Sequence, residues 1–183
     1  MVFLPQDEIS RSKIQEVLEE FTAAEGQEVL GWRDVPVDNS GISQTARDVE
    51  PVIRQLFIRR GINCQTLQDF ERKLFVIRKQ AEHRVSSFGD IGAGGFYLSS
   101  MSARTIVYKG MLLASQVGDY YLDLSDNTFA SSLALVHQRF STNTFPSWEL
   151  AHPFRMIGHN GEFNTLRGNI NWMRARQKAL FSP

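Results

Sequence analysis

The spacing of apolar residues along the chain predicts a mixture of helices and strands. Between residues 8 and 24, apolar side chains from Ile14 to Phe21 recur at the i, i+3, i+4 and i+7 positions. This spacing is typical of an amphipathic helix that lies on a core. Gly26 follows as a stop signal, because glycine readily adopts the backbone angles that end a helix.

A second helix is predicted over residues 66–85. Thr66 can cap its first turn together with Asp69 three residues later, and apolar residues then continue along one face. Short β-branched, aromatic or alternating runs predict strands, of which 52–59 is expected to be central and 96–100 with 105–109 to form a hairpin. The predicted strands are 1–4, 28–35, 52–59, 96–100, 105–109, 132–139 and 156–159, and a third helix is predicted at 165–180.

This order does not alternate strictly between strand and helix. A doubly wound parallel sheet is therefore disfavoured, and a layered α+β domain is favoured. The 183 residues suit one domain with a sizeable core, and no linker or repeat marks a second one. Residues 111–124 are mixed, with a short helical turn expected around Tyr120 and Tyr121.

Composition and charge narrow the classes of function. Apolar residues make up 42% and charged residues 22% of the chain, which is ordinary for a globular protein. The 20 basic residues equal the 20 acidic residues, so no overall field attracts nucleic acid or an anionic membrane. No apolar run approaches the roughly 18 residues that span a bilayer, and the start MVFLPQDE is no secretory signal. The cytoplasm is the expected compartment.

Several catalytic classes lack their motifs. His137, His152 and His159 lie close in sequence, but their spacing fits no zinc pattern and neither cysteine nor an H-E-x-x-H helix accompanies them. The glycines of 86–95 precede a strand rather than a helix, which disfavours a nucleotide loop. No G-x-S-x-G elbow is present. The basic residues of the third helix are interpreted as a solvated face rather than a nucleic-acid site.

Polar residues without helical or strand periodicity concentrate between 136 and 168. Arg139 closely follows an apolar run, and Ser141 and Thr142 come directly after it. A guanidinium with short hydrogen-bonding neighbours can hold a carboxylate, because the arginine fork matches two carboxylate oxygens. An internal salt bridge is the alternative interpretation of Arg139.

Asn160 and Gly161 also allow two interpretations. Asn-Gly between extended segments is a strong signal for a tight hairpin turn. Alternatively, the Asn160 amide and the Gly161 backbone N–H could converge on a developing oxyanion, where glycine would let the backbone approach a substrate closely.

Three stretches together, GWRDVP at 31–36, HQRFSTNTFPSWELAHPFR at 137–155 and HNGEFNTLRGN at 159–169, carry a resemblance to a known family. The chain resembles the amino-terminal glutaminase domain of glutamate synthase large subunits, which are class II, amino-terminal-nucleophile amidotransferases. The likeness extends to the FLPQD start and the LFVIRKQ helix. It implies a four-layer αββα sandwich, of which this chain would form part.

The resemblance also implies roles for individual residues. Arg139 would bind the α-carboxylate of glutamine, with Thr142 and Ser141 nearby, and Asn160 with Gly161 would form the oxyanion hole. The nucleophile of this family is an amino-terminal cysteine whose α-amine acts as base, and an α-amine titrates near ~8. Attack on the glutamine amide would give a thioester and release ammonia, and water would then release glutamate.

The sequence departs from the family at the nucleophile. Residue 1 is methionine, and the single cysteine, Cys64, follows a Gly-Ile-Asn turn far from the amino terminus. We therefore expect residues 1–183 to be a single domain that is part of a type 2 amidotransferase domain, without its nucleophile segment and its C-terminal portion. Such a chain would not turn over glutamine alone.

For the whole enzyme, the resemblance implies partners and cofactors that this chain does not supply. No cofactor or metal is expected here, whereas FMN and an iron-sulfur cluster are expected in the full-length enzyme. Glutamine, the remaining domains and an electron donor, either ferredoxin or a NADPH-linked subunit, are the implied partners, with no nucleic acid or membrane. A plant-type enzyme would lie in a plastid. The rival hypothesis is a noncatalytic module that binds glutamine or another carboxylate.

Overall fold

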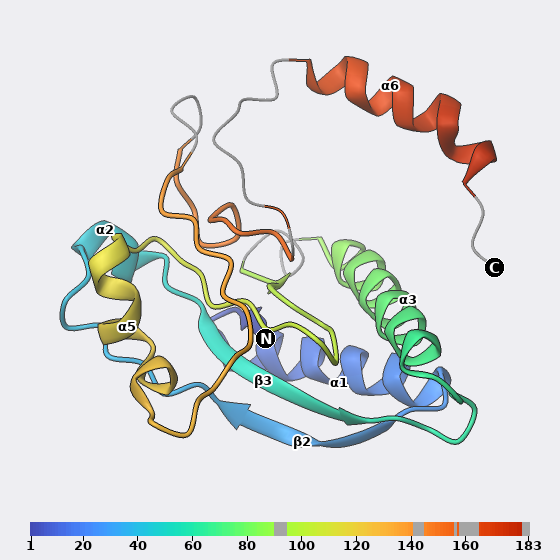
Figure 1. Ribbon diagram of the computed structural model, residues 1–183, viewed down its shortest axis with the longest axis horizontal. Coiled ribbons are helices and arrows are strands. Elements are labelled where there is room, and N and C mark those ends of the chain that lie inside the picture. The colour runs from blue at the N-terminus through green and yellow to red at the C-terminus, as the bar shows by residue number, and fades with distance from the viewer. Residues whose placement is uncertain (90–94, 141–144, 156, 158–164, 181–183) are drawn as a thin grey trace.

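The computed structural model describes residues 1–89, 95–140, 145–155, 157 and 165–180. Within them, four strands form an antiparallel sheet in the order β2-β3-β1-β4 (Figure 1). The strands are β1 (Val2–Leu4), β2 (Glu28–Asp34), β3 (Val52–Arg59) and β4 (Tyr97–Leu98). The α+β class is confirmed, and β3 is central as predicted.

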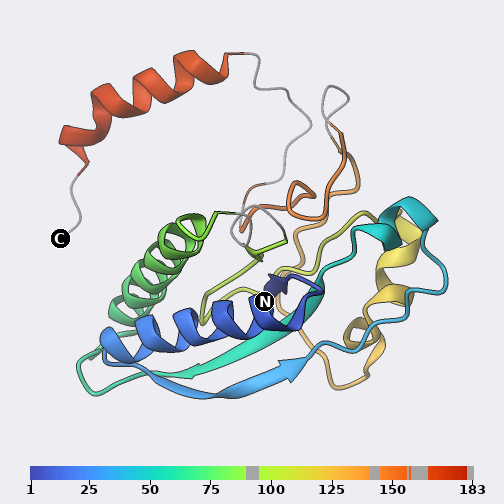
Figure 2. The ribbon, with the colours of Figure 1, turned by 180° about the vertical axis from the view of Figure 1, so that it is seen from behind.

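Helices α1 (Glu8–Ala24) and α3 (Leu67–Ser86) cover one face of the sheet, as the view from behind shows (Figure 2). The predicted stripe is confirmed, because Ile14, Val17 and Leu18 of α1 are buried. The predicted capping box of α3 also forms, with reciprocal hydrogen bonds between Thr66 and Asp69. Burial of these apolar faces supplies the main driving force for the layer.

The other face of the sheet packs against short helices and irregular segments. Successive side chains of β1 point to opposite faces of the sheet. Val2 and Leu4 therefore pack with α1 and α3, whereas Phe3 packs on the other face in a separate aromatic cluster. That cluster includes Tyr120 and Trp148. The expected turn around Tyr120 is confirmed as α5 (Val117–Tyr120), which lies between the 3-10 turns η1 (Ala114–Gln116) and η2 (Leu122–Ser125).

The predicted hairpin of 96–100 with 105–109 is wrong. Only the two residues of β4 form a strand, and β4 pairs with β1. Serine side chains take the place of backbone hydrogen bonds between the two segments. Ser99 Oγ donates to the Val107 carbonyl at 2.9 Å, and the Val107 N–H donates to Ser100 Oγ at 3.2 Å. Serine hydroxyls compete in this way with regular backbone pairing.

The predicted strand 132–139 is also wrong, since the whole segment lacks regular structure. Its apolar side chains are exposed, Leu133 at 74% and Val136 at 81%. A β-strand requires a neighbouring strand to take its backbone hydrogen bonds, and the described part of the chain provides none for this segment. The polar connector between β2 and β3 contains a short helix, α2 (Gln44–Asp48), capped by Ser43.

The third predicted helix is confirmed as α6 (Leu166–Arg176), which continues into the 3-10 turn η3 (Gln177–Ala179). Both ribbon views show α6 apart from the sheet and from α1 and α3 (Figures 1 and 2). Its apolar side chains are exposed, including Trp172 at 78%. Among the described residues, no helix has the length and apolar character needed to cross a membrane.

Candidate functional site

Arg139 lies in an irregular, exposed segment beside the turn that follows Trp148. Its backbone N–H donates to Nδ1 of His137 at 3.2 Å. The His137 ring stacks on the His152 ring, with centroids 4.4 Å apart. The structure therefore brings together the two halves of the long motif at 137–155.

The other predicted site residues lie outside the described part of the chain. Ser141 and Thr142 fall in 141–144, and Asn160 and Gly161 fall in 158–164. Their assignments stay predictions. The predicted strand 156–159 is described only at Ile157, which forms an isolated bridge with Phe154.

A tight turn stands between the described motif and Asn160. Phe154 and Ile157 exchange two backbone hydrogen bonds of 2.9 and 2.8 Å. Within this turn, Arg155 has a φ of 53°, a left-handed conformation that non-glycine residues seldom adopt. Ile157 is three residues before Asn160 in the sequence.

The Arg155 side chain ties this turn to α3. Its Nη2 lies 3.5 Å from Oε2 of Glu71, whose side chain is only 7% exposed. The Glu71 carboxylate also accepts from Ser102 Oγ at 3.0 Å and from the Ala103 N–H at 2.7 Å. One buried carboxylate thus fixes the 102–103 loop and the Arg155 turn relative to the same helix.

Trp148 anchors the beginning of the turn region in the aromatic cluster. The indole is buried, packs edge-on against Phe3 and donates from Nε1 to the Ala46 carbonyl at 3.0 Å. Gly110 passes directly under the ring, because a Cβ on Gly110 would lie 2.3 Å from Trp148 Cζ3. The indole of Trp148 therefore occupies the space that a side chain at position 110 would need.

Lys109 is the second anchor, and it is only 3% exposed. Its Nζ donates to the Glu149 carbonyl at 2.8 Å and to the Tyr97 hydroxyl at 3.2 Å. The ammonium also lies 4.4 Å from the ring centroids of Tyr97 and Phe154, a cation–π arrangement. Burial lowers the pKa of Lys109 to about 7, and the charge of Arg78 acts in the same direction.

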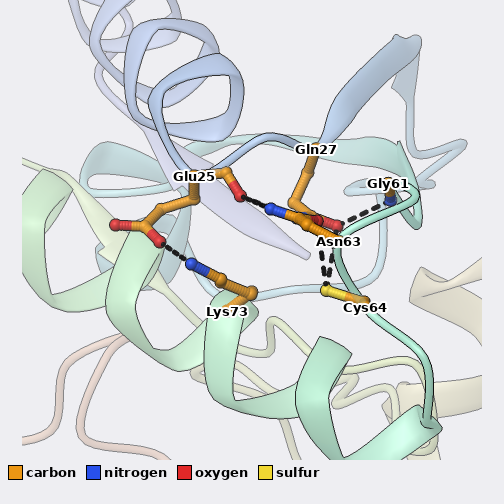
Figure 3. Close-up of polar contacts among 6 residues, drawn as sticks. All are labelled: Glu25, Gln27, Gly61, Asn63, Cys64 and Lys73. Atoms are coloured by element: carbon orange, nitrogen blue, oxygen red, sulfur yellow. Dashed lines mark hydrogen bonds and ion pairs between the residues drawn. The ribbon is translucent and has the colours of Figure 1, made fainter.

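Cys64, the only cysteine, is part of a structural network rather than of this region (Figure 3). It is 4% exposed, and its sulfur lies 3.7 Å from Gln27 Oε1 and 3.5 Å from Asn63 Oδ1. Gln27 also accepts the Gly61 N–H at 2.9 Å, so it links the loop before β2 to the loop after β3. A thiol buried in this way is a poor nucleophile.

Two of the three histidines weighed as zinc ligands lie in the described part of the chain. His137 and His152 stack on one another, and His159 lies outside the described residues. Among the described residues, no group of three or more histidine, cysteine, aspartate or glutamate side chains could hold a metal ion.

Sequence reasoning missed both anchors of the turn region. A signal for Lys109 was available, since it is a lone charge within the apolar run IVYKGMLL at 106–113. Such a charge is either exposed at an edge or buried with partners. Trp148 gave no comparable signal, because its contact with Gly110 joins residues far apart in the sequence.

Comparison with known proteins assigns the family. The model of the class II glutamine amidotransferases matches residues 1–183, the whole chain. The chain belongs to the class II glutamine amidotransferases. The resemblance carried by the three motifs is thereby confirmed.

The chain is similar to the amino-acid sequences of glutamate synthases. The NADPH glutamate synthase large chain of Bacillus subtilis is 52% identical over 182 residues, covering 100% of this chain and 12% of the relative. The chloroplastic ferredoxin-dependent enzyme of Oryza sativa subsp. japonica is 45% identical over 183 residues, covering 100% of this chain and 11% of the relative. This amidotransferase chain therefore spans about one eighth of the length of the relatives it matches.

Proposed function

We propose that this chain is the glutaminase part of a glutamate synthase, which makes glutamate from glutamine and 2-oxoglutarate. The observation that carries the proposal is the match to two glutamate synthases, at 52% identity over 182 residues and 45% identity over 183 residues. The reaction assigned to this part is hydrolysis of the glutamine side-chain amide, with release of ammonia.

In this proposal Arg139 binds the α-carboxylate of glutamine, with Ser141 and Thr142 beside it. The support from the described residues is that Arg139 is exposed, so a ligand can reach its guanidinium, and that its backbone N–H donates to His137, whose ring stacks on His152. Two parallel N–H···O bonds would then orient the substrate.

Asn160 and Gly161 are proposed as the oxyanion hole, and the nucleophile as an amino-terminal cysteine outside these 183 residues. Burial of Cys64 in the Gln27 network supports this assignment, because its sulfur is enclosed beside Gln27 and Asn63. We propose that the chain alone binds glutamine without turning it over.

The proposed fold of the complete domain is the four-layer αββα sandwich. One sheet with α1 and α3 on a single face would supply two of the four layers. The exposed apolar residues of 133–136 and α6 would be covered in the complete domain, since large apolar patches are rarely left exposed.

FMN and an iron-sulfur cluster are proposed only for the parent enzyme. One buried cysteine cannot supply the four thiolates that such clusters use, so residues of this chain do not fit that group. The electron donor is proposed as ferredoxin or a NADPH-linked subunit, and the location as cytoplasm or, for a plant-type enzyme, a plastid.

The test compares this chain with one extended at both ends to the length of its relatives. Ammonia release is measured with glutamine as substrate, and binding to the present chain is measured by calorimetry. We expect turnover only by the extended chain. Turnover by the present chain that disappears in Cys64→Ala would contradict the assigned roles, and binding without turnover by both chains would favour a noncatalytic module.

Arg139→Ala in the extended chain tests the substrate site. Truncating one partner of a desolvated charge pair typically costs about 2 to 5 kcal/mol, so KM for glutamine should rise by at least ~10-fold. Arg60→Ala is the matched control, because Arg60 is an exposed arginine at the end of β3. An equal rise in both variants would mean that Arg139 has no special role.

A further inference from the structure

We propose that Lys109 is a positioning residue for glutamine hydrolysis, acting through the segment that leads into the oxyanion hole. The inference rests on the proposed function of this chain. It assigns to Lys109 no contact with substrate. Its effect comes from the contacts it makes with Glu149 and Phe154.

The first observation is the arrangement of groups around the ammonium. Within the described part of the chain, its hydrogen bonds and ring contacts are with uncharged groups, namely the Glu149 carbonyl, the Tyr97 hydroxyl and the Tyr97 and Phe154 rings. The Glu149 carboxylate attracts the ammonium without forming an ion pair, and the charge of Arg78 repels it. A buried lysine whose contacts are uncharged loses hydration without full compensation. Stability alone therefore gives little reason for a lysine here, and an apolar residue of equal length would serve it at least as well.

The second observation is where these contacts fall along the chain. Glu149 and Phe154 begin and end a stretch of six residues, so a single cation holds both ends of 149–154. Phe154 is the residue that exchanges two backbone hydrogen bonds with Ile157. Asn160 is three residues after Ile157 in the sequence, a span of at most ~10 Å, and we infer that a displaced turn displaces Asn160.

The third observation is that the same stretch leads to the substrate arginine. The Phe154 ring packs on His152 with centroids 4.6 Å apart, and His152 stacks on His137. The His137 ring accepts the backbone N–H of Arg139. This second path passes through two ring contacts, whereas Asn160 is three residues after the turn in the sequence. We therefore expect the oxyanion hole to be affected more than carboxylate binding.

The backbone of Lys109 is itself fixed, which allows its side chain to act as an anchor. Its carbonyl accepts from the buried Tyr121 hydroxyl at 2.7 Å. Gly110, the next residue, lies against the Trp148 ring. Lys109 therefore extends from a rigid part of the core to a turn that has few other attachments among the described residues, Arg155 with Glu71 being one of them.

The experiment uses the chain extended to the length of its relatives, with Lys109→Met. Methionine keeps the length of the side chain and removes the donor and the charge. We expect kcat for ammonia release to fall by about 10²-fold, as when an oxyanion-hole donor is misplaced, while KM for glutamine changes less than ~5-fold. The thermal midpoint should stay equal or rise, because a buried cation has been removed.

Lys73→Met is the matched control. Lys73 lies on α3 and forms an ordinary ion pair at 2.6 Å with Glu25, which follows α1 (Figure 3). It should leave kcat and KM unchanged. Phe154→Leu is the second variant, which keeps Lys109 and removes one ring face, and it should lower kcat by roughly 10-fold.

The outcomes separate the two proposals. If the unmodified extended chain releases no ammonia, the proposed function fails. If it does, but Lys109→Met folds and retains its kcat, the positioning role is wrong. Should Lys109→Met not fold, Phe154→Leu decides, because unchanged kcat in that folded variant also overturns the role. A loss of kcat shared equally by Lys73→Met would show a general effect and likewise overturn it.

Discussion

Replacing Gly110 with alanine tests the packing that holds Trp148. The added Cβ would lie 2.3 Å from Cζ3 and 2.6 Å from Cε3 of the indole, whereas ordinary contacts begin near 3.4 Å. The ring must therefore retreat by about 1 Å. Its surroundings resist this movement, because Phe3 and Tyr120 pack against the ring.

The expected cost has two parts. Overpacking of a filled core costs about 1 to 3 kcal/mol. Movement of the indole also weakens the 3.0 Å hydrogen bond to the Ala46 carbonyl, and an unsatisfied buried acceptor costs about 1 to 3 kcal/mol. We therefore expect the free energy of unfolding to fall by ~2 to 5 kcal/mol, a large share of the ~5 to 15 kcal/mol typical of a domain.

The assay is urea denaturation of the 183-residue chain, followed by far-ultraviolet circular dichroism. Gly118→Ala is the control, because nothing lies within 4 Å of a Cβ at that position. It should leave stability unchanged or raise it by about 0.4 to 1 kcal/mol. The comparison separates a clash from the general effect of adding a methyl group to glycine.

A double-mutant cycle with Trp148→Leu would refute or support the explanation. The smaller side chain removes the clash, so Gly110→Ala should cost less than ~1 kcal/mol in that background. If Gly110→Ala destabilises the Trp148→Leu protein as much as the original, contact with the indole is not the cause.

Three further predictions concern elements that position the site. Thr66→Ala should lower stability by about 1 kcal/mol in the same denaturation assay, because the capping box of α3 is lost; an unchanged midpoint would contradict this. Gln27→Leu should lower it by ~1 to 3 kcal/mol, because the Gly61 N–H loses its acceptor, and a neutral result would show that the network in Figure 3 is dispensable. Hydrogen bonding to Arg33 holds the pKa of Asp123 below its ordinary value of 3.8. The Arg33–Asp123 pair therefore stabilises the fold above pH 3.8, and this stabilisation is lost as the pH falls through the lowered pKa. The stability difference between the original protein and Arg33→Met should shrink on acidification, and a constant difference would argue against the pair.

The sequence by itself determined the elements whose signals are local. The apolar stripe of α1 and the Thr66 and Asp69 capping box were predicted, because spacing and capping depend on neighbours within a few residues. The strand β3 was predicted from its β-branched and aromatic residues. The family was also determined by the sequence, since its long motifs are specific. The roles of Arg139 and Asn160 remain predictions on that basis.

Only the tertiary structure decided features that depend on distant partners. The apolar run 132–139 was predicted as a strand, but strand formation requires a neighbour that no local pattern specifies. The contacts that anchor the turn region could not be predicted for the same reason. Lys109 contacts Glu149, and Gly110 contacts Trp148, across about 40 residues of sequence. Local sequence predicts which backbone conformation a segment prefers, whereas the fold decides which buried groups face one another, and here that placement fixes the turn before the proposed oxyanion hole.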